Sequence, residues 1–73
     1  MNGYTNWETW HVASLIDNDE LLYNISIEAS DYADFLHRIL DAAWLGSTTP
    51  DGVEWDSLEI NHDELDVLIA ENV

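Results

Sequence analysis

Lysine and cysteine are both absent from the sequence, and Arg38 is its single arginine. Without cysteine the fold has neither a disulfide nor a thiolate zinc site, and nothing indicates an oxidising compartment. No apolar run is long enough to cross a bilayer, and the first residues lack the basic start and apolar stretch of a signal peptide. We therefore expect a protein of the cytosol.

Negative charge dominates the chain. Sixteen Asp and Glu residues, spread from Glu8 to Glu71, give a formal net charge of −15 on 73 residues. Such a charge repels itself in the folded state, and a surface that is acidic only for solubility normally intersperses both signs. Anionic membranes and nucleic acid would be repelled, so neither is expected as a direct partner. The missing counter-charge indicates that a one-signed surface is favoured.

The apolar residues predict a folded domain rather than a disordered acidic chain. Hydrophobic residues make up 47% of the sequence, including four tryptophans, which is ample for a core. A domain of roughly 60 residues buries only about 60% of its unfolded surface, so a homodimer would help this one, and the oligomeric state stays open. We expect residues 1–73 to form a single, mainly α domain of three or four helices.

Two helices are predicted in the first 29 residues. Asn6 is a suitable cap for a helix over residues 7–17, whose apolar side chains fall on two nearly opposite faces: Trp7 and Trp10 on one, Val12 and Ile16 on the other. Asn18 or Asp19 then starts a second helix that ends near Ala29.

The clearest helical periodicity follows Ser30, which opens a third segment. Its inward positions are apolar and recur at helical spacing: Tyr32, Phe35, Leu36, Ile39, Leu40, Ala43 and Trp44. Gly46 is the expected C-terminal cap. Residues 47–52 predict a loop with a turn at its end.

The last part of the chain predicts one more helix. Residues 53–60 could form a short extended piece, or a helical turn from Trp55 to Leu58, and the sequence leaves both open. Asn61 is the expected cap of the final helix, with Glu64 completing a capping box. The inward side chains are expected to be Leu65, Leu68 and Ile69.

Catalytic and metal-binding patterns are weak. The sequence has no Gly-rich phosphate loop, no cysteine nucleophile and no nucleophile elbow. The acids from Asp17 to Glu20 lack calcium-loop spacing and suit helix capping better. His11, His37 and His62 share no zinc-ligand spacing. We expect no enzyme, no cofactor and no metal site, and the sequence leaves open whether the acids bind a divalent cation.

Acidic side chains recur along the helices at spacings that suit a folded partner surface. Asp31, Asp34 and Asp41 form one row on the third helix, and Asp63, Asp66 and Glu71 form another on the last helix. These six are the predicted partner-binding residues. A third row follows in the loop and the segment after it, at Asp51, Glu54, Asp56 and Glu59.

The N-terminal third carries a recognisable signature. Residues 4–10 read YTNWETW, residues 15–20 read LIDNDE, and Leu22 and Tyr23 follow. This resembles a family of small acidic proteins of phages and mobile elements, and the resemblance implies a phage or plasmid origin more firmly than a mechanism. The signature residues also have a structural interpretation, with Asn6 as a cap, Trp7 and Trp10 in the core, and residues 17–20 joining two helices.

Charge and size suggest the function. Proteins hold duplex DNA chiefly through Lys and Arg contacts to phosphates, and spaced carboxylates can occupy the same basic grooves. The protein is similar in size and charge to DNA-mimic anti-CRISPR and antirestriction inhibitors, which implies a basic nucleic-acid-binding protein of a host defence complex as partner. The alternative is an interaction or assembly module that docks through an exposed Trp44 or Trp55, with the acids serving solubility.

Overall fold

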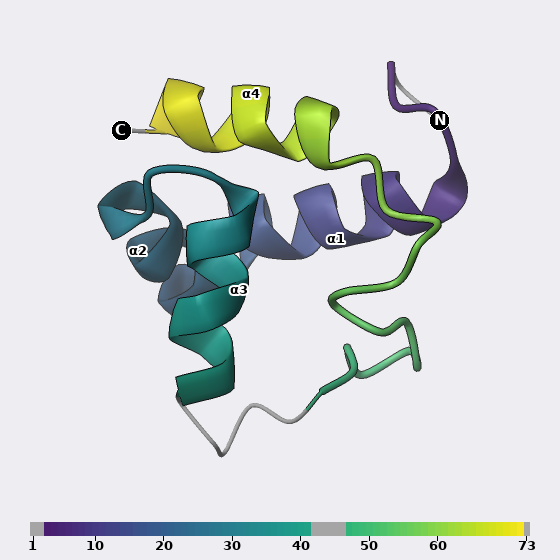
Figure 1. The fold of residues 1–73 in the computed structure, drawn as a ribbon, viewed down its shortest axis with the longest axis horizontal. Helices are drawn as coiled ribbons and strands as arrows, with labels where there is room; N and C mark the ends of the chain where they lie inside the picture. The colour runs from purple at the N-terminus through teal and green to yellow at the C-terminus, as the bar shows by residue number, and fades with distance from the viewer. Residues whose placement is uncertain (1–2, 42–46, 73) are drawn as a thin grey trace.

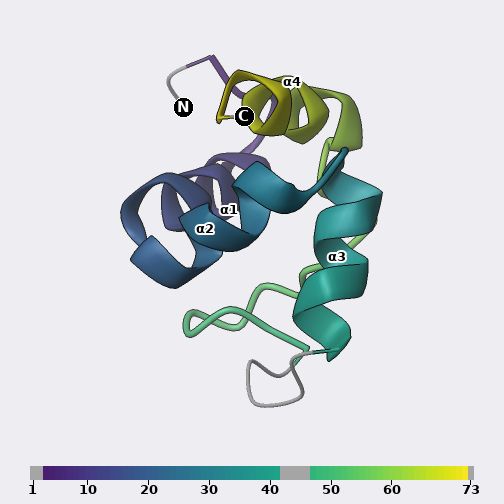
Figure 2. The same cartoon turned by 90° about the vertical axis from the view of Figure 1, so that its left-hand side faces the viewer.

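Four helices build the domain in the computed structural model, which describes residues 3–41 and 47–72. They are α1 (Trp7–Asn18), α2 (Glu20–Glu28), α3 (Tyr32–Asp41) and α4 (His62–Asn72). Helices α1 and α4 lie side by side and run in the same direction, whereas α3 crosses them steeply (Figures 1 and 2). Helix α4 also contacts α2 and α3. The expected mainly α fold is confirmed.

Local capping explains the first two helices. The Asn6 side chain accepts a hydrogen bond from the Thr9 amide at 2.9 Å, which confirms Asn6 as the cap of α1. Asp19 ends α1 by donating its amide to the Leu15 carbonyl, and its carboxylate accepts the Leu22 amide at 3.1 Å to start α2. One residue thus closes one helix and opens the next, as the predicted junction at residues 17–20 requires.

The cap of α4 is half of the predicted capping box. The Asn61 side chain accepts the Glu64 amide at 3.1 Å, so Asn61 is the cap. The reciprocal bond is absent among the described residues, because the Asn61 amide instead donates to the buried Thr9 hydroxyl at 2.9 Å. The Glu64 carboxylate accepts the Thr5 amide at 2.9 Å. Both contacts tie α4 to the N-terminal segment.

The core lies where all four helices meet. Its buried apolar side chains come from every helix and from the segment before α4: Val12, Ala13, Ile16, Leu22, Ala29, Tyr32, Phe35, Ile39, Trp55, Ile60, Leu65 and Ile69. Leu68 packs against this core. Leu40, by contrast, is 54% exposed, so its predicted inward position is wrong. The predicted positions Ala43, Trp44 and Gly46 lie outside the described residues.

Trp7 is not a core residue. It is 41% exposed, whereas Trp10 is half-buried, so the assignment of both to the core is corrected. The Trp7 ring stacks on the buried His11 ring, with centroids 4.8 Å apart and planes 7° from parallel. Val12 and Ile16 fill the core from the other side of α1. Trp7 therefore covers the edge of the fold.

The segment before α4 is made of turns. Within residues 47–60, a single antiparallel bridge joins Thr48 and Glu54, and no strand forms. Gly52, with φ of 88°, completes the predicted loop turn by donating its amide to the Thr49 carbonyl. The amides of Ser57 and Ile60 each close a further turn. The extended alternative for residues 53–60 is thus wrong, because Trp55 and Ile60 reach the core through turns.

Removing the Tyr32 hydroxyl should lower stability and change its dependence on alkaline pH. This hydroxyl is buried and donates to the Trp55 carbonyl, so Y32F should cost about 1–2 kcal/mol at neutral pH. Burial, and secondarily Asp56, raises the pKa of Tyr32 above its ordinary 10.0. The stabilisation is therefore complete below pH 10.0 and is lost as pH rises above it.

Thermal unfolding from pH 7 to about 11 tests this prediction. The wild type should lose stability above pH 10 more steeply than Y32F. Equal losses in the two proteins would contradict the assigned role of Tyr32.

Candidate acidic interface

All sixteen carboxylates lie in described residues, and none is buried: eleven are exposed and five are half-buried. Arg38, the single arginine, is already engaged. Its Nε lies 3.1 Å from the Asp34 carboxylate and its guanidinium 3.6 Å from that of Glu28. The surface therefore offers carboxylates to a partner while its arginine serves the contact between α2 and α3.

Two of the predicted contact residues of the first row form hydrogen bonds at the N-terminus of α3. The Asp31 carboxylate accepts the Asp34 amide at 2.8 Å, and the Asp34 carboxylate accepts the Ser30 amide at 3.0 Å. Asp31 is therefore the capping residue of α3. The Ser30 amide, followed by Arg38, lowers the pKa of Asp34. Asp41, the third member of this row, is exposed at the end of α3.

The row on α4 also contains both a residue that stabilises the fold and residues that are exposed. The Asp66 carboxylate accepts the Tyr32 amide at 2.8 Å and so caps α3 from the neighbouring helix. Asp31, Asp34 and Asp66 thus meet at the α3 N-terminus, where the helix dipole favours negative charge. Asp63 and Glu71 are exposed. Of the six predicted contact residues, Asp41, Asp63 and Glu71 are the ones available to a partner.

Of the three predicted rows, the third takes the least part in side-chain hydrogen bonds within the fold. We call residues 51–61 the acidic segment; it passes beside α1 and leads into α4 (Figure 1). Its carboxylates are exposed: Asp51, Glu54, Asp56 and Glu59. Asp51 lies near the His11 ring, and none of the others pairs with a described basic side chain. In the sequence, this surface is indicated by the high density of acidic residues in this stretch.

Side-chain contacts at both ends hold the acidic segment in place. The Thr49 hydroxyl lies 3.0 Å from the buried His11 ring and accepts the Val53 amide at 3.2 Å. The Asp51 carboxylate lies 3.7 Å from the same ring. The Glu59 carbonyl accepts the Asn6 side chain. The acids are therefore displayed from a fixed chain and not from a loose tail.

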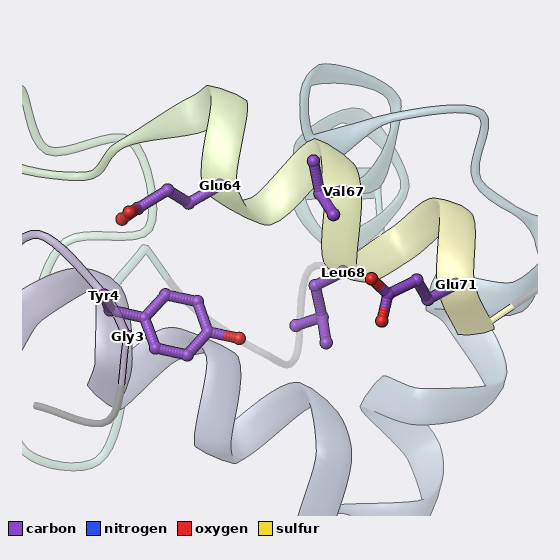
Figure 3. A pocket seen from close by; sticks show the side chains of 6 residues that line it. All are labelled: Gly3, Tyr4, Glu64, Val67, Leu68 and Glu71. Atoms are coloured by element: carbon purple, nitrogen blue, oxygen red, sulfur yellow. The ribbon is translucent and has the colours of Figure 1, made fainter.

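A second acidic feature is a cleft of about 330 Å³ between the N-terminal segment and α4 (Figure 3). We call it the Tyr4 cleft; its lining residues are Gly3, Tyr4, Glu64, Val67, Leu68 and Glu71. Burial raises the pKa of Tyr4, and the charges of Asp17, Glu64 and Glu71 raise it further. The sequence did not predict this cleft, because it depends on contacts between the two ends of the chain.

The described residues contain no group of three or more His, Asp or Glu side chains arranged to hold a metal ion. His11 is buried against Thr49, whereas His37 and His62 are exposed on different helices. Over the same part of the chain, no helix has the length and apolar character needed to span a membrane.

Screening should stabilise the protein, because its carboxylates repel one another. Raising ionic strength from about 0.01 M to 1 M shortens the screening length from about 30 Å to about 3 Å. If screening lowers the repulsion energy of the folded state by about 1 kcal/mol, the Tm should rise by roughly 4–8 °C in a domain of this size. Thermal unfolding in an NaCl series measures this rise. A Tm that stays constant or falls would contradict strong self-repulsion.

Comparisons with known proteins place the chain in a family. No curated protein and no solved structure shows significant similarity to it. One family model, described as a family of unknown function, matches residues 1–73. The chain belongs to this family, DUF7249.

Proposed function

We propose that the protein occupies the basic nucleic-acid-binding groove of a partner by imitating phosphate charge. The observation that carries this proposal is the acidic segment, whose carboxylates at Glu54, Asp56 and Glu59 are exposed and have no cationic partner among the described residues. Asp41, Asp63 and Glu71 extend the available charge onto α3 and α4. The proposed partner belongs to a host defence system, either a CRISPR effector or a restriction enzyme.

Fixed geometry supports mimicry over mere solubility. DNA presents closely spaced charges along a stiff backbone, about one per 1.7 Å of axis. The turns of the acidic segment, the hydrogen bond from Asn6 to the Glu59 carbonyl and the one from the Asn61 amide to Thr9 of α1 hold the carboxylates in place before binding. A preorganised surface loses less conformational entropy on association than a flexible acidic tail does.

The alternative, a module that docks through exposed aromatic side chains, has less support. Trp55 is 3% exposed, so it is unsuited to anchor an interface. Trp44 lies outside the described residues. The most exposed large apolar side chains among the described residues are aliphatic and come from separate elements: Leu40, Leu58 and Val67. The exposed aromatic side chains, Trp7 and Tyr23, are each less than half exposed and lie on different helices. Binding by this route would be insensitive to salt.

An affinity capture from bacterial lysate tests the proposal. Tagged protein is washed at low and at high salt, with and without competing duplex DNA. A defence nuclease or its DNA-binding subunit, released by both salt and DNA, is the expected result. A partner that resists both treatments would contradict mimicry and favour the docking module.

A further inference from the structure

We infer that the Tyr4 cleft receives an arginine side chain of the basic partner. This inference rests on the proposed function and adds a specific anchoring site to it. The cleft combines a phenol ring, an aliphatic floor and two carboxylates within about 330 Å³, a volume at the lower end of the range for ligand sites.

The two carboxylates stand at opposite ends of the cleft. Glu64 and Glu71 are seven residues apart on α4, which corresponds to two turns and about 10 Å of rise on one face. Val67 and Leu68 lie between them (Figure 3). A long side chain could therefore lie along an apolar floor and meet a carboxylate at its end.

Tyr4 supplies the other wall. In Figure 3 its ring lies across from α4, and its hydroxyl points toward Leu68 and Glu71. Burial is the main cause of the raised pKa of Tyr4, and the nearby charges of Asp17, Glu64 and Glu71 raise it further. The field in the cleft is thus negative, which favours a cation and repels an anion.

Arginine fits these features better than other basic groups. Its guanidinium is planar, stacks on aromatic rings and pairs with carboxylates through two parallel hydrogen bonds. Its aliphatic stem can cover Val67 and Leu68 while the charge reaches Glu71. A lysine ammonium would also be attracted to the ring and to a carboxylate, but it cannot stack flat on the ring or pair with the carboxylate through two parallel hydrogen bonds. The larger cavity, about 540 Å³ beside Trp55, is lined by one carboxylate, Asp19, and so lacks the same charge complementarity.

Binding of octa-arginine and octa-lysine peptides at low salt tests the inference. The wild type should bind octa-arginine about fivefold more tightly, since a cation–π contact at an exposed site is worth up to about 1 kcal/mol. E71Q and Y4L should each lose most of this preference. The control E20Q, which removes an exposed carboxylate from α2, should keep it.

NMR shows where the probe binds. It compares the wild type with E71Q, so its result does not depend on whether Y4L folds. With N-acetyl-arginine amide as probe, the amide shifts of Gly3 and of residues 64–71 should move in the wild type and much less in E71Q. Equal affinity for both peptides, with shifts spread over the surface, would overturn the arginine site and leave charge mimicry standing. Failure of both peptides to bind would contradict the site and the proposed function together.

Discussion

The triple variant E54Q/D56N/E59Q is expected to bind its basic partner about 100-fold more weakly than the wild type at physiological salt. Each carboxylate is exposed on the acidic segment and makes no intramolecular ion pair among the described residues. A loss of about 1 kcal/mol per interfacial charge pair gives about 3 kcal/mol in all, or roughly two decades in Kd. Titration calorimetry with the captured partner measures this change.

A matched variant separates the acidic segment from bulk charge. E8Q/E20Q/E28Q also removes three carboxylate charges, which lie on α1 and α2 and belong neither to the acidic segment nor to the Tyr4 cleft. It should weaken binding by no more than a few fold, because distant exposed charges are largely screened. If both triple variants lose affinity equally, the acidic segment has no special role and only net charge matters.

The double variant D31A/D66A should lose about 3 kcal/mol of unfolding free energy. Asp31, which directly precedes α3, caps this helix. Asp66, which lies on α4, accepts the Tyr32 amide. Loss of a cap costs about 1 kcal/mol, and loss of a hydrogen bond to a charged group costs about 1.5–3 kcal/mol. A domain of this size has roughly 4–11 kcal/mol in total, so the variant would be marginal. Urea unfolding measures the loss.

Asp41 and Asp63 provide the matched control. Both are exposed, and D41A/D63A should change the unfolding free energy by no more than about 0.5 kcal/mol per site. Comparable losses in the two double variants would show that self-repulsion or general helix effects, and not capping of α3, determine stability. The same reasoning makes lysine substitutions at Asp31 and Asp34 unsuitable for testing binding, because they would disturb the fold.

Local signals in the sequence predicted most of the helices. Caps at Asn6, Asp19 and Asn61 depend on residues three positions away, so they are visible without tertiary information. The buried positions Phe35 and Ile39 follow equally from helical periodicity.

Contacts between distant residues account for what the sequence missed. Asp66 was expected on a partner surface, but its acceptance of the Tyr32 amide joins residues 34 positions apart. Glu64 reaches Thr5 across 59 positions, which removes the second half of the capping box and forms one end of the Tyr4 cleft. Neither contact has a local pattern that could reveal it.

Two apolar side chains show the limits of periodicity. Trp7 lies at the start of α1, where it covers His11 and stays 41% exposed. Leu40 has the spacing of a core residue but is 54% exposed near the end of α3. A helical pattern predicts the direction in which each side chain points. Burial also requires a neighbouring helix or segment that packs against the side chain at that position along the helix.

Competition between this protein and DNA for the captured partner tests the central claim most directly. The apparent Kd of the partner for duplex DNA is measured with increasing amounts of the protein, at about 50 mM and about 200 mM salt. Phosphate mimicry predicts that the apparent Kd rises in proportion to protein concentration and that the protein's own affinity falls steeply at the higher salt. DNA binding that is unaffected by the protein, or inhibition that is independent of salt, would contradict it.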